Sequence, residues 1–219
     1  FFFSNYLRIC NWRRKKDMFF FRERKLQHFL LLMLVVASTT TSKCRKKIPV
    51  NDHGIQPTTI ISEAKELHAN NLLLFIPILS TEWSVQLQFK LLSEHADGRW
   101  CNIMHVTKGQ NRDVYGDRVP AIFFDKFNMI LSIQSAVNGI ISYNIFHTIQ
   151  YNTEYNVEIH QRYKSGGVYK YSILFNGEEI HSTNNTQARQ FYGVKVYISD
   201  PWYNACIGLV KNVKITNFL

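Results

Sequence analysis

The segment best equipped for chemistry lies near the end of the chain, at Ser199-Asp200-Pro201-Trp202-Tyr203-Asn204. Alternating apolar and polar residues precede and follow it, so we expect a loop at the rim of a sheet, where binding residues often lie. The rings of Trp202 and Tyr203 suit stacking on a sugar, while Asn204 and Arg118 suit hydrogen bonds with its hydroxyls. The alternative for Trp202 is that it closes the end of the core.

The acidic residues do not form a pattern that is typical of catalysis. Glycoside hydrolysis needs two carboxylates facing one cleft. Glu178 and Glu179 are adjacent, so on a strand they face opposite sides. Glu158 alternates with His160 but has no second acid beside it, and no nucleophile-elbow sequence is present. The sequence therefore predicts a binding protein with no catalytic residues.

A secretory leader is expected at residues 18–42, beginning at Met18. Basic residues open it, and an apolar run at 29–37 is followed by small residues that offer a cleavage site. Because this run is shorter than the ~20 residues that span a bilayer, a cleaved signal is favoured over an anchor. Residues 1–17 are expected to be non-native upstream sequence or an extension of the leader, and the alternative is a cytoplasmic tail on a signal anchor. The sequence thus predicts a secreted, extracellular protein with no stable membrane span.

The charge balance argues against a nucleic-acid partner. The formal net charge is +10, but residues 1–42 carry 8 basic and 2 acidic residues. Residues 43–47 carry four further basic side chains, which leaves 14 basic against 14 acidic at 48–219. Nucleic-acid binding needs a basic face on the domain itself. The cluster at 43–47 is expected to be a solvated tail, and the alternative is a contact with sulfated glycans or an anionic membrane.

Three cysteines follow the leader: Cys44, Cys101 and Cys206. An odd number in an oxidising compartment leaves at least one thiol free or paired between chains. Cys101 and Cys206 lie in the strand-rich region and are the expected disulfide, whereas Cys44 is the candidate link in a homodimer. Buried free thiols are the alternative. Asn184 heads an Asn-Asn-Thr sequon and is the candidate glycosylation site.

The segments that must position the candidate binding residues are predicted to be strands. Period-two alternation recurs at 72–76, 83–91, 129–133, 155–160, 168–175, 194–198 and 209–215. Asn138-Gly139 and Asn176-Gly177 are hairpin-turn dipeptides. We expect one all-β, two-sheet antiparallel sandwich at 71–219, after a basic extended lead-in at 43–70 with a short helical stretch at 62–68. Most aromatic residues, Phe123 among them, are expected to pack in it.

Four stretches carry a resemblance to the laminin G-like and concanavalin A-like jelly-roll superfamily of lectins and extracellular modules, of a secreted invertebrate type. They are Trp83–Phe89, the pair 102–107 with 115–124, the pair 155–161 with 175–180, and the pair 196–203 with 208–213. The resemblance implies a jelly-roll sandwich. It does not transfer an activity, because shared folds host different functions.

The resemblance also implies a calcium ion at the sandwich rim, with Asp117 and Asp200 as its candidate ligands. The alternative is local: Asp117 pairs with Arg118, and Asp200 caps a turn before Pro201. The sequence as a whole predicts a secreted, non-catalytic module that binds carbohydrate or an extracellular glycoprotein through its rim loops. The second hypothesis is a structural or adhesive matrix component, linked as a dimer through Cys44.

Overall fold

The computed structural model describes residues 53–92 and 98–219. The expected leader, the basic cluster and Cys44 lie outside these residues, so the secretion and dimer predictions stay predictions. No helix in the described ranges has the length and apolar character needed to cross a membrane.

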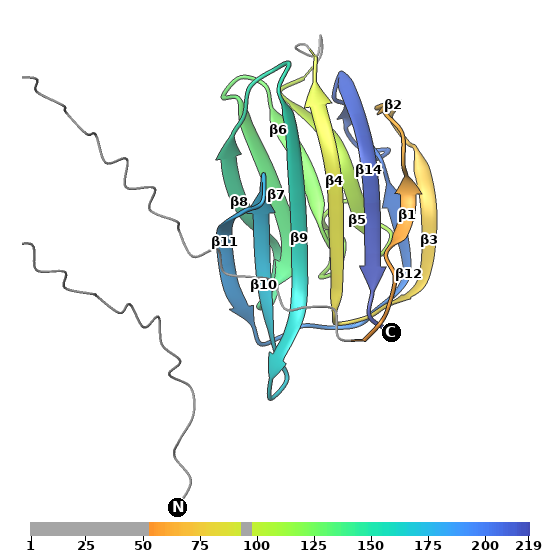
Figure 1. The fold of residues 1–219 in the computed structure, drawn as a ribbon, viewed down its shortest axis with the longest axis vertical. Coiled ribbons are helices and arrows are strands. Elements are labelled where there is room, and N and C mark those ends of the chain that lie inside the picture. Colours follow the sequence, from red (N-terminus) through yellow and green to blue (C-terminus); the bar gives the residue numbers. More distant parts are fainter. Residues whose placement is uncertain (1–52, 93–97) are drawn as a thin grey trace, which may run out of the picture. The chain divides into compact units, whose positions relative to one another are not determined.

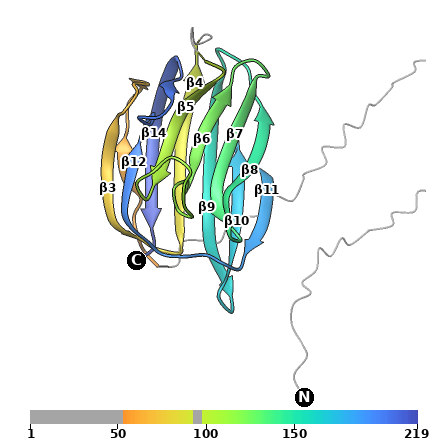
Figure 2. The same cartoon turned by 180° about the vertical axis from the view of Figure 1, so that it is seen from behind.

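Two seven-stranded sheets stack face to face (Figures 1 and 2). Sheet A has the order β1-β14-β4-β9-β10-β11, with β2 beside β14, and sheet B has the order β3-β12-β5-β6-β7-β8, with β13 beside β5. Sheet A contains β1 (Thr58–Ile61), β2 (Lys65–Glu66), β4 (Trp83–Leu91), β9 (Glu154–Ser165), β10 (Val168–Phe175), β11 (Glu178–Asn185) and β14 (Gly208–Asn217). Sheet B contains β3 (Leu72–Leu79), β5 (Trp100–Thr107), β6 (Ala121–Asp125), β7 (Ile130–Val137), β8 (Ile140–Thr148), β12 (Phe191–Tyr197) and β13 (Asn204–Ala205). The predicted two-sheet antiparallel jelly-roll sandwich is confirmed.

Period two builds the core between the sheets. Burial alternates without a break along β4, where every odd-numbered residue from Trp83 to Leu91 is buried, because successive strand residues face opposite sides of the sheet. The two predicted Asn-Gly turns join β7 to β8 and β10 to β11. Asn138 and Asn176 there have φ of 50° and 51°, the left-handed conformation that such turns require.

The predicted lead-in is wrong in its secondary structure. Thr58–Ile61 forms β1 and Lys65–Glu66 forms β2, both antiparallel to β14, so the sandwich begins before residue 71 and no helix forms at 62–68. The β-branched run Thr58-Thr59-Ile60-Ile61 favours a strand, and pairing with β14 buries Ile61. Long-range pairing here outweighs the local helical pattern.

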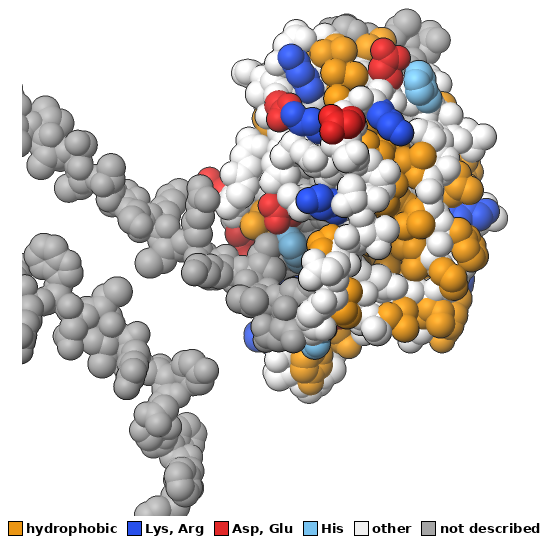
Figure 3. Space-filling model, turned by 45° about the vertical axis from the view of Figure 1, so that its right-hand side comes forward, with side chains coloured by type: hydrophobic (Ala, Val, Ile, Leu, Met, Phe, Trp, Pro, Cys, Tyr) orange, Lys and Arg blue, Asp and Glu red, His pale blue; other side chains and the backbone are white. Residues whose placement is uncertain are grey.

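The edge strand β3 presents apolar side chains to solvent. Leu72 and Phe75 of β3 and Tyr192 of the neighbouring β12 are exposed, on a side of the sandwich where Figure 3 shows hydrophobic side chains gathered. The opposite edge of the same sheet, β8, exposes Phe146. Sheet B therefore carries one exposed phenylalanine on each of its two edge strands.

Candidate functional site

A pocket of about 240 Å³ opens on the outer face of sheet B. Its lining combines aromatic, amide and guanidinium side chains: Trp100, Arg112, Arg118, Phe123, Gln134, Asn144, Phe146 and Tyr203. Phe123 of β6 and Phe146 of β8 belong to one cross-strand row, because each of them is in register with Ser132 of β7, which lies between them. Gln134 and Asn144 are direct partners in the next row. Residues in register on neighbouring strands share a face, so four strand residues converge on this surface.

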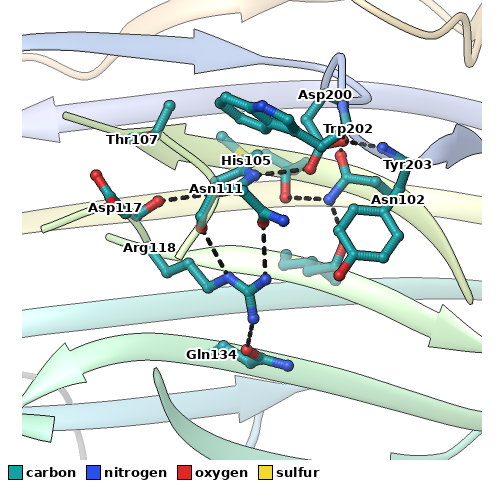
Figure 4. Close-up of polar contacts among 12 residues, drawn as sticks. Asn102, His105, Thr107, Asn111, Asp117, Arg118, Gln134, Asp200, Trp202 and Tyr203 are labelled. Carbon is teal, nitrogen blue, oxygen red and sulfur yellow. Dashed lines mark hydrogen bonds and ion pairs between the residues drawn. The ribbon is translucent and has the colours of Figure 1, made fainter. Parts of the chain in front are cut away.

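Arg118 forms the floor of the pocket and is only 3% exposed. Its Nε donates to the Asn111 carbonyl at 3.1 Å, and its Nη2 donates to Asn111 Oδ1 at 2.8 Å. Its Nη1 donates to Gln134 Oε1 (Figure 4). The guanidinium carbon lies 4.7 Å from the centre of the Phe123 ring, within the range of a cation–π contact. Burial lowers the pKa of Arg118, and the nearby Tyr203 hydroxyl opposes that change.

Aromatic rings form the walls of the pocket. Tyr203 packs edge-on against Phe123 with ring centres 5.0 Å apart and an interplanar angle of 62°. Phe146 stands on β8 with 58% of its surface exposed, so most of its ring is open to a ligand. Trp100 lies at the start of β5 beneath the Arg99 guanidinium, 5.7 Å away. The pocket thus has both open and packed aromatic surface.

Asp200 holds the loop that carries Tyr203. Its Oδ1 accepts from the backbone N–H groups of Trp202 at 3.0 Å and Tyr203 at 2.8 Å. Its Oδ2 lies 2.7 Å from His105 Nδ1, and His105 Nε2 lies 2.6 Å from the carbonyl oxygen of Asp117. Asp200 and His105 are both fully buried. Asp200 therefore fixes the turn, as in the alternative that the sequence left open, and it does so through His105 of β5.

The residues do not fit the calcium site that the resemblance implied. Oδ2 of the buried Asp117 accepts from the N–H groups of Asp113 and Val114, both at 2.7 Å. Asp117 thus organises its own loop instead of pairing with Arg118, and the Asp200 oxygens face His105 and the backbone. Within 53–92 and 98–219 no three His, Cys, Asp or Glu side chains gather as metal ligands. Both carboxylates already have partners, so we assign neither of them to a metal.

The other predicted site residues divide into two groups. Arg118 and Tyr203 come together in the pocket. Trp202 is 38% exposed and packs edge-on against His105 at 5.4 Å, so it covers the loop and does not line the pocket. Asn204 lies in β13, in register with Cys101, and lines a different pocket of about 440 Å³ beside the disulfide.

The structure also locates the predicted disulfide and the candidate glycosylation site. Cys101 and Cys206 form a disulfide across 105 residues, which ties β5 to the end of the Tyr203 loop. Asn184, the candidate glycosylation site, is exposed near the end of β11, an edge strand of sheet A. Its side-chain oxygen accepts from Lys164 Nζ at 3.4 Å.

Sequence reasoning missed most of the pocket. Phe123 was assigned to packing, and Gln134, Asn144, Phe146 and Trp100 were not selected. The available signal was a pair of polar residues at alternate positions of β7, where Ser132 and Gln134 flank the apolar Ile133. Such residues point away from the core, but only the strand register places Gln134 beside Asn144.

Comparison with known proteins gives similarity to solved structures only. No family model matches the chain, and no curated protein matches it. A heptameric SAP-like pentraxin from Limulus polyphemus aligns with 13% identity and a TM-score of 0.48, over 72% of this chain and 77% of the pentraxin. The carbohydrate-binding module CBM66 from Bacillus subtilis aligns with 11% identity and a TM-score of 0.39, over 75% of this chain and 98% of the module.

A third similar structure is the exoplasmic/lumenal domain of VIP36 in a Ca²⁺- and Man3GlcNAc-bound form. It aligns with 14% identity and a TM-score of 0.41, over 75% of this chain and 83% of that domain. At these identities and TM-scores the similarity assigns no role to any residue of this chain.

Proposed function

We propose that this protein is a secreted, non-catalytic module that binds carbohydrate in the pocket on the outer face of sheet B. The observation that carries the proposal is the convergence of Phe146, Tyr203, Gln134, Asn144 and Arg118 around one opening. Sugars present apolar ring faces and rims of hydroxyls, and this lining offers aromatic faces together with amide and guanidinium groups.

The scaffold suits such a role. Four of the lining residues stand on adjacent strands, and the loop that carries Tyr203 is fixed by Asp200 and by the disulfide of Cys206. Side chains held on rigid elements lose little conformational entropy on binding. The volume of about 240 Å³ lies below the roughly 300–1,000 Å³ of pockets for drug-sized ligands. It matches a terminal sugar better than a long chain segment.

An extracellular setting is consistent with the covalent chemistry. Disulfides such as Cys101–Cys206 persist mainly in oxidising compartments, and the leader expected at 18–42 would deliver the chain there. The exposed Asn184 sequon is compatible with passage through the same route. The partner we propose is therefore a glycan or an extracellular glycoprotein.

The test is a glycan array probed with the 219-residue protein and two variants. Phe146→Ala removes an aromatic wall of the pocket, and Phe75→Ala removes a phenylalanine of similar exposure, 56% against 58%, from the opposite edge strand. We expect binding that weakens about tenfold or more in Phe146→Ala and is unchanged in Phe75→Ala. Equal loss in both variants, or no glycan binding by the wild type, would overturn the proposal.

A further inference from the structure

We propose that the sugar bound in this pocket is acidic, with its carboxylate recognised by Arg118 and Arg112. The inference rests on the carbohydrate-binding function proposed above and names the class of sugar. It begins from the charges around the pocket: the lining contains two arginines and no aspartate or glutamate. Arg112 is exposed at the rim, while Arg118 is buried at the floor.

Arg118 is buried and forms no direct ion pair with a carboxylate in the described part of the chain, although the charge of Asp200 acts on it at longer range. Its hydrogen bonds go to the oxygens of Asn111 and Gln134 and to the Tyr203 hydroxyl, and none of them goes to a carboxylate. The domain treats its other buried arginine differently, because Arg162 donates to the Glu82 carboxylate at 2.5 Å. A buried charge is costly unless an opposite charge pairs with it. The Arg118 guanidinium at the pocket floor therefore has no carboxylate bound directly to it, and an anionic ligand would supply that partner.

The nearest carboxylates are engaged elsewhere. Asp200 faces His105 and two backbone amides, and Asp117 faces the amides of its own loop. The positive charge of Arg112 adds to the burial that lowers the pKa of Arg118. A bound anion would relieve both effects, because it compensates desolvation and like-charge repulsion together.

The guanidinium retains the donors that such an anion requires. Arginine carries five N–H groups, and the bonds to Asn111 and Gln134 use the Nε donor and one donor on each terminal nitrogen. The Tyr203 hydroxyl also hydrogen-bonds this guanidinium, so one N–H remains without a partner in the protein. A carboxylate that accepts this donor together with one from Arg112 would form charge-assisted hydrogen bonds, which are among the strongest in proteins. A neutral hydroxyl would use one donor and leave the charge uncompensated.

The experiment is a glycan array of matched pairs, in which each uronic-acid or sialic-acid glycan is printed beside its methyl ester. The ester keeps the ring and the hydroxyls and replaces the charged carboxylate by a neutral group that is one methyl larger. We expect the wild-type protein to prefer the acid by about tenfold or more, the effect of one charge-assisted hydrogen bond. Arg112→Ala should weaken binding of the acid more than binding of the ester, so the preference falls.

Two further variants keep the test specific. Arg189→Ala removes an exposed guanidinium that stacks on Tyr115 outside the pocket, so it should not alter the preference. Arg118→Lys keeps a positive charge but loses the planar fork, and it should lower the preference while its thermal melt confirms folding. A preference retained in both Arg112→Ala and Arg118→Lys would overturn the inference. Equal binding of acid and ester that Phe146→Ala abolishes would overturn it and leave the carbohydrate function standing, whereas no hits at all would overturn both.

Discussion

Replacing Asp200 should destabilise the fold, because its carboxylate joins β5 to the loop that carries Tyr203. Asp200→Ala removes the partner of the fully buried His105 at 2.7 Å and the acceptor of two backbone N–H groups at 2.8 and 3.0 Å. Removing this acceptor leaves buried donors unsatisfied at about 1–3 kcal/mol each, or about 3–5 kcal/mol for the group together. We expect a loss in that range, measured as the free energy of unfolding in urea.

Asp200→Asn separates the two halves of this network. The amide oxygen still accepts from the Trp202 and Tyr203 N–H groups, while His105 then faces a neutral amide instead of a carboxylate. One hydrogen bond to a charged group contributes about 1.5–3 kcal/mol, so Asp200→Asn should lie between the wild type and Asp200→Ala. Asp113→Ala is the control, because this aspartate of the neighbouring loop is exposed and should change stability by no more than about 0.5 kcal/mol.

Two results would refute this account of Asp200. One is a cost below about 1 kcal/mol for Asp200→Ala, equal to that of Asp113→Ala. The other is a fall in the melting temperature of the wild type when EDTA is added, since a metal bound to the native state would stabilise it by mass action. The observed hydrogen bonds predict that EDTA leaves the melting temperature unchanged.

Three further predictions concern covalent, pH-dependent and ionic effects. The double variant Cys101→Ala/Cys206→Ala opens a link across 105 residues and should lose about 4.8 kcal/mol of unfolding free energy by loop entropy; a urea titration showing less than about 1 kcal/mol would contradict this. Burial lowers the pKa of His147 from its usual 6.5, so the unfolded chain takes up the proton first and stability should fall as the pH drops through about 6.5. His147→Gln should reduce that fall in urea titrations at several pH values, and an unchanged slope would count against it. Binding of an acidic glycan should weaken from low to high salt while binding of its methyl ester does not, and titration calorimetry at two salt concentrations compares the two.

The fold could be predicted from the sequence wherever alternation and turn dipeptides agree. Two strands have the predicted bounds, Trp83–Leu91 and Val168–Phe175. Alternation of apolar and polar residues places one face of each strand in the core, and the Asn-Gly turn ends the second strand. The first strands escaped prediction because β1 and β2 are short and depend on β14, which lies more than 140 residues further along the chain. A local sequence pattern cannot reveal a pairing between strands that lie so far apart in the chain.

The pocket was harder to predict for a related reason. The alternation of side chains along a strand predicts that Phe123 and Ile122 face opposite sides of β6, but it does not predict which loops cover the outer side. The loop residues Arg118 and Tyr203 were selected by chemical type, and the structure places both of them in one pocket, while their role in binding stays a prediction. Their strand partners depend on the register of β6, β7 and β8, which the sequence does not specify.

The charge expected of the ligand changes from positive to negative once the burial of the acidic side chains is known. In the sequence, Asp117 and Asp200 in loop positions suggested that the rim attracts a cation. In the structure both carboxylates turn inward, where amide N–H groups and His105 use their oxygens. That arrangement removes negative charge from the surface and leaves Arg112 and Arg118 as the charged groups of the pocket. The acids that seemed to bind the ligand instead hold the loops that present the arginines, so the pocket selects for an anion.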